Sequence, residues 1–260
     1  MMKIASLGSS FAAGPGIKPI VNRSAMRSGS NYANLVAQCL EADLTDLSIS
    51  GATLLTIWNE PQVLFGQKFE PQLNGLPEDI DIVFILGGGN DIQYIGGMIF
   101  DSIESYWFGR MVMSMKNSLF QDLSTPNDIP DEEVLSERYG VVLDAIHTKA
   151  PKAKVLVLEY LTILGPDVKP GVDVPFDAVC VEKYRNIASK LQRATSTAIN
   201  GRQKWCQRVP VAELSEQHGL GSNEPWVWGF GLKAILGGAI YHPNEVGMKA
   251  VADMILKTMN

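Results

Sequence analysis

Four short segments of the chain carry groups that could do chemistry together. They are Gly8-Ser9-Ser10, Ser50-Gly51-Ala52, Gly88-Gly89-Asn90-Asp91 and Tyr241-His242-Pro243. They offer a hydroxyl, a backbone N–H beside a glycine, a side-chain amide and an imidazole. A serine hydroxyl becomes a nucleophile when a base takes its proton, and imidazole can do this near neutral pH. Attack on an ester carbonyl creates an oxyanion that needs fixed hydrogen-bond donors, so this set favours acyl transfer through serine.

The elements that must position these groups alternate between strands and helices. Apolar or alternating runs predict strands over Ile4–Leu7, Ala42–Ile49, Asp81–Leu86, Lys154–Tyr160 and Val209–Leu214. Apolar residues at helical spacing predict helices between them, the first over Arg27–Leu40 and the last over Glu245–Lys257. Such alternation predicts a mostly parallel sheet covered on both faces. The first three chemical segments follow strands, so they should converge at the carboxyl edge of the sheet, with the imidazole before the last helix.

The composition of the chain excludes several other classes. With 260 residues and 46% hydrophobic residues, one doubly wound domain accounts for residues 1–260. A net charge of −6 without a Lys/Arg-rich run argues against nucleic acid, or an anionic membrane surface, as the main partner. No apolar run is long enough to span a membrane. Three widely spaced cysteines, Cys39, Cys180 and Cys206, form neither a disulfide framework nor a zinc site.

The expected surroundings of the protein follow from these absences. No secretory signal precedes the first strand, and the cysteine usage suits a reducing compartment, so we expect a cytoplasmic protein. The chemistry requires no cofactor and no metal. We expect a monomer that binds a small-molecule ester.

The four segments, in their order along nearly the whole chain, resemble the blocks of the SGNH hydrolases, also called the GDSL esterase/lipase family. The resemblance implies that Ser10 is the nucleophile and His242 the general base. It implies an oxyanion hole made by the N–H groups of Ser10 and Gly51 and by the side chain of Asn90. The implied fold is a three-layer α/β/α sandwich of flavodoxin-like type with a five-stranded parallel sheet.

Two positions depart from the family pattern. The family usually has aspartate before the serine, where this chain has Ser9. It also has aspartate three residues before the histidine, where this chain has Ala239. Some similar members with a Trp-containing loop use a backbone carbonyl there, so the Ala239 carbonyl is the candidate orienter of the imidazole. Glu224 and Asp173 are competing candidates from loops.

Simpler roles exist for several of these residues. Ser9 adjoins Ser10, and only the block pattern favours the second serine. His218 is a weaker candidate base, and His147 is expected on the surface. Asn90 alone would be interpreted as a turn residue, and His242 alone as a helix cap.

The substrate pocket is predicted from composition only. A helical segment around residues 92–121 is rich in methionine and aromatic residues, including Met98, although such a stripe more often packs on the core. With Trp226, Trp228 and Phe230, it could line an acyl pocket. The sequence therefore predicts a serine esterase or lipase acting through an acyl-enzyme.

Three other functions compete with this prediction. A catalytically weak or inactive ligand-binding protein of the same fold and a carbohydrate O-acetyl esterase are the alternatives that remain open. A nucleotide-binding domain is disfavoured, because the Gly8–Gly16 loop has neither the Gly-Xaa-Gly-Xaa-Xaa-Gly spacing nor a Gly-Lys-Ser/Thr ending.

Overall fold

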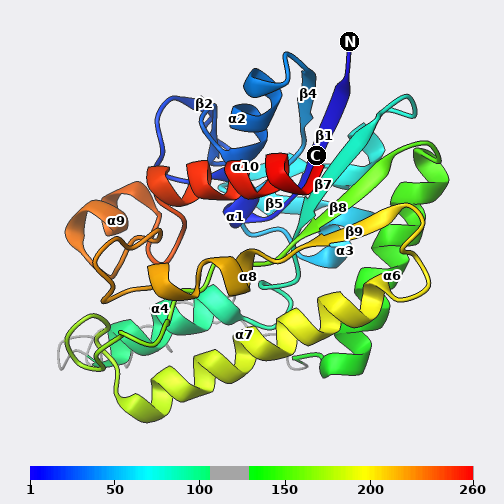
Figure 1. Cartoon of the computed structure of the whole chain (residues 1–260). Helices are drawn as coiled ribbons and strands as arrows, with labels where there is room; N and C mark the ends of the chain where they lie inside the picture. Colours follow the sequence, from blue (N-terminus) through cyan, green and yellow to red (C-terminus); the bar gives the residue numbers. More distant parts are fainter. Residues whose placement is uncertain (106–128, 260) are drawn as a thin grey trace.

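The computed structural model describes residues 1–105 and 129–259, and a five-stranded parallel sheet runs through it (Figure 1). In spatial order the strands are β4 (Asp43–Asp46), β1 (Lys3–Gly8), β7 (Ile82–Leu86), β8 (Lys154–Leu158) and β9 (Cys206–Val209). In chain order this is 2-1-3-4-5, the flavodoxin-like arrangement that the resemblance to the SGNH hydrolases implies. The order changes direction at β1, the strand that leads into Ser10.

The central strands are buried on both faces because their sequences are apolar throughout. All five residues of β7 are buried, and β1 is buried from Ile4 onward. The two strands pair in parallel register, with Gly8 opposite Leu86. Helices cover both faces of such a sheet, which explains why its strands lack a polar side.

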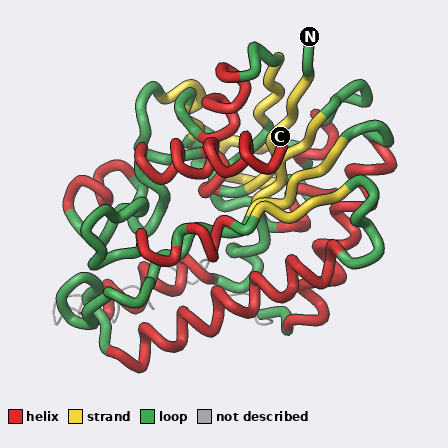
Figure 2. The backbone as a smooth tube through the Cα atoms, in the orientation of Figure 1, coloured by secondary structure: helices red, strands yellow, loops and turns green. Residues whose placement is uncertain are grey.

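Two helical layers enclose the sheet, as Figures 1 and 2 show. On one face α2 (Tyr32–Cys39) packs against α10 (Glu245–Met259). On the other, α6 (Glu132–Lys149) packs against α7 (Ala178–Ile199) and α3 (Leu54–Trp58). The chain is therefore a three-layer α/β/α sandwich.

Side-chain caps help to fix where several helices begin. Asn31, Asp131 and Asp177 each accept a hydrogen bond from the backbone N–H three residues later, at the starts of α2, α6 and α7. Thr53 and Thr56 form a reciprocal capping box at the start of α3. This last cap lies two residues after Gly51, so it also steadies the second chemical segment.

Shorter elements complete the described chain. They are α1 (Ser10–Ala13), the hairpin β2 (Ile20–Asn22) and β3 (Arg27–Ser28), the hairpin β5 (Gln62–Leu64) and β6 (Gln67–Phe69), η1 (Gln72–Gly75), α4 (Tyr94–Ser105), α8 (Val211–Leu214), η2 (Glu216–His218) and α9 (Leu232–Gly237). No helix among residues 1–105 and 129–259 is long and apolar enough to cross a bilayer.

Some predicted boundaries are wrong. The fifth strand was expected over Val209–Leu214, but β9 ends at Val209 and α8 follows, because Pro210 has no N–H to continue the ladder. The second strand is shorter than expected, and the first long helix starts at Tyr32 because Arg27 and Ser28 form β3. Of the Met/aromatic segment, α4 is helical as expected, whereas residues 106–121 lie outside the described residues.

Candidate active site

Ser10 is held at the end of the central strand β1 by close packing of the main chain. Gly8 has φ +152°, and a Cβ there would lie 2.3 Å from the carbonyl oxygen of Leu86, so only glycine fits. The Gln72 side chain binds both backbone groups of Gly8, accepting from its N–H at 2.8 Å and donating to its carbonyl at 2.9 Å. The chain then enters α1 with Ser10 as its first residue.

The hydroxyl of Ser10 contacts the imidazole of His242. Ser10 Oγ lies 2.7 Å from His242 Nε2, across 232 residues of sequence. The other ring nitrogen, Nδ1, lies 2.7 Å from the carbonyl oxygen of Ile240. A carbonyl can only accept a hydrogen bond, so Nδ1 carries the proton and Nε2 is left to accept from the Ser10 hydroxyl. This tautomer suits an imidazole that removes the serine proton.

Burial keeps this imidazole neutral. His242 is 7% exposed and Ser10 8% exposed. Burial lowers the pKa of His242 to about 4, an effect that the hydrogen bond to the Ile240 carbonyl only partly opposes. At neutral pH the ring is therefore a neutral base, with its one proton on Nδ1.

The group that orients the ring differs from the expectation. The Ala239 carbonyl accepts from the backbone N–H of His242 at 3.0 Å and does not hold the ring; Ile240 supplies the carbonyl that binds Nδ1. Tyr241, between them, has φ +61°, and this turn brings the Ile240 carbonyl back toward the ring.

The two competing acids are engaged elsewhere. The Asp173 carboxylate accepts from the backbone N–H of Lys169 at 2.8 Å. Glu224 lies beside His218, whose Nδ1 is 3.0 Å from the Glu224 carbonyl oxygen. Neither carboxylate takes the place of the family's aspartate.

The Trp-containing segment carries the histidine through main-chain pairing. The Trp228 N–H donates to the His242 carbonyl at 2.8 Å, and the Trp228 carbonyl accepts from Tyr241 N–H at 2.9 Å. The Asn244 N–H donates to the Trp226 carbonyl at 2.9 Å. These bonds make a short antiparallel bridge. The sequence does not predict it, because glycines interrupt any strand pattern there.

The remaining hydroxyl and imidazole candidates have other partners. Ser9 Oγ lies 3.0 Å from the Tyr160 hydroxyl. The His218 ring stacks on Trp226 at 3.7 Å, and the His147 ring stacks on Trp205 at 4.2 Å. Of the serines and histidines that the sequence proposes, Ser10 and His242 are the pair in contact.

The second and third segments are in contact with each other. The Asn90 side-chain amide donates to the carbonyl of Ala52 at 2.8 Å, which leaves its second N–H for another acceptor. Gly51, which precedes Ala52 in the chain, has φ +80°. The Ser10 N–H lies in the first turn of α1, where a helix offers its N–H no internal partner. These are the three donors proposed for an oxyanion hole.

Two neighbouring side chains were not predicted. The Asp91 carboxylate is 6% exposed and accepts from the Leu54 N–H at 3.0 Å; burial raises its pKa to about 6. The Tyr160 hydroxyl, besides contacting Ser9, accepts from the Gly89 N–H at 3.1 Å. Burial raises the pKa of Tyr160 to about 12, so it stays protonated. Both follow or end predicted strands, and that position is the signal that could have found them.

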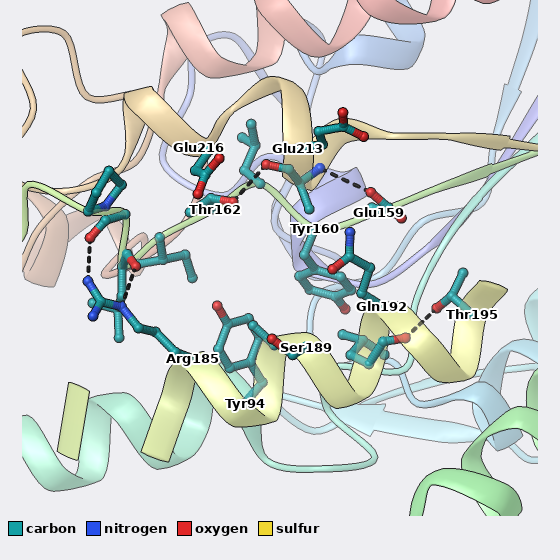
Figure 3. A pocket seen from close by; sticks show the side chains of 18 residues that line it. Tyr94, Glu159, Tyr160, Thr162, Arg185, Ser189, Gln192, Thr195, Glu213 and Glu216 are labelled. Atoms are coloured by element: carbon teal, nitrogen blue, oxygen red, sulfur yellow. Dashed lines mark hydrogen bonds between the residues drawn. The ribbon is translucent and has the colours of Figure 1, made fainter. Parts of the chain in front are cut away.

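One cavity lies beside Tyr160. It has a volume of about 760 Å³ and is bounded by α7, α8 and residues 159–166. Figure 3 shows Tyr160 and Tyr94 in its wall, with Ser189 and Gln192 of α7 nearby. Ser10 and His242 do not line it.

The predicted acyl-pocket residues lie elsewhere. Met98 is fully buried in the core. Trp226, Trp228 and Phe230 are partly exposed and belong to the segment that carries His242. Their contact with a substrate stays a prediction. Among the described residues, no group of three or more His, Cys, Asp or Glu side chains could hold a metal ion.

Comparisons with known proteins give a family for this arrangement. The sequence pattern of the GDSL-like lipase/acylhydrolase family matches residues 6–250. A search of curated proteins gives no match. Among solved structures, an extracellular lipase from Streptomyces rimosus has 21% identity and a TM-score of 0.71, with 99% of each chain covered. Phospholipase A1 from Streptomyces albidoflavus NA297 has 17% identity and a TM-score of 0.72, with 98% of each chain covered.

A further similar structure is a two-domain protein. The carbohydrate esterase family 2 enzyme from Corynascus thermopiles, which carries a carbohydrate-binding domain, has 17% identity and a TM-score of 0.57. The match covers 99% of this chain but only 65% of the Corynascus enzyme. At these identities the likeness shows a shared fold. The family pattern spans almost the whole chain, and the chain therefore belongs to the GDSL-like lipase/acylhydrolase family.

Proposed function

We propose that this protein hydrolyses carboxylic esters, with Ser10 as nucleophile and His242 as general base. The observation that carries the proposal is the 2.7 Å contact between Ser10 Oγ and His242 Nε2, with Nδ1 held by the Ile240 carbonyl. A neutral ring in this tautomer can accept the serine proton without first losing its own. The family supports hydrolysis, and the geometry supports serine as the attacking group.

The reaction would proceed in two halves. Ser10 Oγ forms a bond to the acyl carbon while its proton moves to Nε2, and the carbonyl oxygen becomes an oxyanion. Asn90 and the N–H groups of Ser10 and Gly51 would stabilise that charge. When the bond from the acyl carbon to the alcohol oxygen breaks, His242 returns the proton to the alcohol.

Water completes the cycle by the same route. Its proton moves to Nε2 and its oxygen bonds to the acyl carbon of the acyl-enzyme. The bond to Ser10 Oγ then breaks, and the serine recovers its proton from the imidazole. In both halves the charged imidazolium is stabilised by a neutral carbonyl, which helps it less than a carboxylate would.

A fluorophosphonate tests the nucleophile directly. Intact mass should rise by one phosphonyl group, and peptide mapping should place the group on Ser10. Ser10→Ala should stay unmodified, and Ser9→Ala should react. A label on Ser9 or on another residue would contradict the assignment.

A panel of substrates separates the alternatives. Chromogenic esters of increasing chain length and acetylated sugars would be compared on the same preparation. Preference for acetylated sugars would favour the carbohydrate esterase alternative, in line with the similarity to the carbohydrate esterase from Corynascus thermopiles. Absence of turnover on every ester, together with absence of labelling, would favour a ligand-binding protein.

A further inference from the structure

Negative charge is distributed unevenly along this chain. The net charge is −6, yet residues 4–40 contain no Asp or Glu, and neither do residues 225–244. These two segments supply Ser10 and His242. They also carry Lys18, Arg23 and Lys233, all of which are exposed. Arg27 differs from these, since its guanidinium donates to the Ser48 carbonyl and lies 3.5 Å from Asp46.

Helix α9, within the second segment, turns its apolar face to solvent. Leu232 is 72% exposed, Leu236 79% and Ile235 46%. These three residues are spaced i, i+3 and i+4, so they share one side of the helix. Surface helices ordinarily turn such a stripe toward the core. The nearby hairpin adds Val21 of β2, which is 62% exposed.

The end of α9 rests on the loops that follow the nucleophile. A Cβ on Gly238 would lie 2.6 Å from the Met26 side chain, between β2 and β3. A Cβ on Gly16 would lie 3.0 Å from the Cβ of Ala239 and 3.3 Å from the Gly237 carbonyl oxygen. Figure 1 shows α9 at one end of the molecule, away from the long helices α6 and α7. The apolar face, the hairpin and the Ser10–His242 pair therefore adjoin one another.

We propose that α9 and the β2–β3 hairpin form a docking surface for an anionic lipid–water interface. Exposed leucines next to cations bind such an interface by inserting apolar side chains and attracting anionic headgroups. A six-residue helix is too small for the roughly 800 Å² per partner of a stable protein interface, which disfavours a second copy as the occupant. An overall negative charge argues against binding to an anionic membrane only when the acidic residues are spread evenly over the surface. Here residues 4–40 and 225–244 contain no acidic residue.

Docking there would place the Ser10–His242 pair at the lipid surface. His242 follows α9 by five residues, and the Ala239 N–H donates to the Ala234 carbonyl at 2.8 Å, which ties the helix to the histidine loop. The idea that the lipid also supplies the ester substrate rests on the proposed function. The proposal that this surface binds lipid does not depend on that function.

Vesicle co-sedimentation of the full chain tests the surface. The Ser10→Ala variant would be used, so that hydrolysis cannot alter the vesicles. We expect stronger binding to mixed phosphatidylcholine and phosphatidylglycerol vesicles than to phosphatidylcholine alone. The double variant L232S/L236S should weaken binding about tenfold or more. Its matched control, V172S/V179S, removes two valines that are 77% and 78% exposed on another part of the molecule and should change nothing.

A second pair of variants tests the charge. K18Q/R23Q should weaken binding to the mixed vesicles by about tenfold. K152Q/K204Q removes two exposed lysines elsewhere and should bind as the parent does. Equal binding to both kinds of vesicle would overturn the role of charge.

The outcomes separate this proposal from the esterase proposal. In the Ser10-containing protein, L232S/L236S should hydrolyse a soluble short-chain ester at the parental rate. Failure of vesicle binding in a protein that hydrolyses soluble esters would overturn the docking surface alone. A dimer in sedimentation velocity that L232S/L236S dissociates would assign the face to a second copy instead. If L232S/L236S fails to fold, vesicle binding by K18Q/R23Q still tests the docking surface.

Discussion

Ser10 lies directly after a strand of the central sheet, whereas His242 lies on a loop outside the sheet. The serine follows β1, whose neighbour β7 leaves no room for a side chain at Gly8. The histidine lies on an irregular segment that hydrogen bonds from Trp226 and Trp228 hold in place. One position is fixed by steric contact in the core, the other by main-chain pairing near the surface.

This contrast explains how the His242 ring is oriented without the aspartate that the family usually has. The position of His242 and its tautomer are both set by carbonyl groups, which every residue type possesses. A carboxylate would add charge stabilisation but is not needed for orientation. On the nucleophile side, in contrast, the type of residue at Gly8 is decisive.

The largest expected effect is the loss of kcat when Ser10 or His242 is replaced, and it tests whether the two residues work as a pair. Ser10→Ala should lower kcat by about 10⁵–10⁶, and His242→Ala should cost a similar factor. The double variant should be little worse than either, because each change already disables the pair. Steady-state kinetics on a chromogenic ester measures this, with Ser9→Ala as a largely active control. Two independent, additive losses would contradict a nucleophile–base pair.

A smaller loss is expected at Asn90, the side chain proposed to donate to the oxyanion. Asn90→Ala should lower kcat by about 10²–10³, with less change in KM, because the amide is needed most when the oxyanion forms. The variant also loses the bond to the Ala52 carbonyl, so its thermal unfolding should be compared with the parent's. An unchanged kcat would remove Asn90 from the oxyanion hole.

Stability should distinguish the two regions at their glycines. Gly8→Ala forces a Cβ against the Leu86 carbonyl and should reduce the free energy of unfolding by about 3 kcal/mol or more. Gly229→Ala, in the histidine-bearing segment, meets only the Leu220 side chain at 3.5 Å and should stay within about 0.5 kcal/mol. Urea denaturation measures both. Equal costs would break the comparison between a sterically fixed and a loop-borne half.

The smallest expected effect concerns pH. Because the pKa of His242 is lowered to about 4, kcat/KM should hold down to mildly acidic pH and fall as pH drops through about 4. The contribution of His242 to stability should fall as pH drops from 6.5 to about 4, since the unfolded chain takes up a proton there that the folded ring does not. Asp91 opposes this fall over the same range, so the loss of stability is measured in an Asp91→Asn variant.

Asp91 is the nearby group to exclude, because its raised pKa of about 6 has the opposite sign: folding favours its protonated form, so it costs stability as pH rises through this region. An Asp91→Asn variant should keep the acidic limb of activity in place. If kcat/KM instead fell as pH dropped through about 6.5, the ordinary pKa of histidine, the ring would not be buried as described.

Much of the fold could be predicted from the sequence. The strands β1, β7 and β8 are continuous apolar runs, and their alternation with helices predicts a parallel sheet whose carboxyl ends share an edge. Ser10, Asn90 and His242 each lie at a break in that pattern, and the resemblance to the blocks of the family singled them out from neighbours such as Ser9. The fifth strand was misplaced because the apolar residues of α8 resemble a strand over so short a length.

The sequence by itself indicated that Ser10 and His242 would meet, because apolar strand runs, glycine breaks and the order of the family's blocks can all be identified along the chain. Only the tertiary structure decided how they meet. The Ile240 carbonyl replaced the expected Ala239 because a single positive φ at Tyr241 turned the chain. The links from Tyr160 to Ser9 and Gly89 depend on contacts more than 70 residues apart in the chain, which no local pattern encodes.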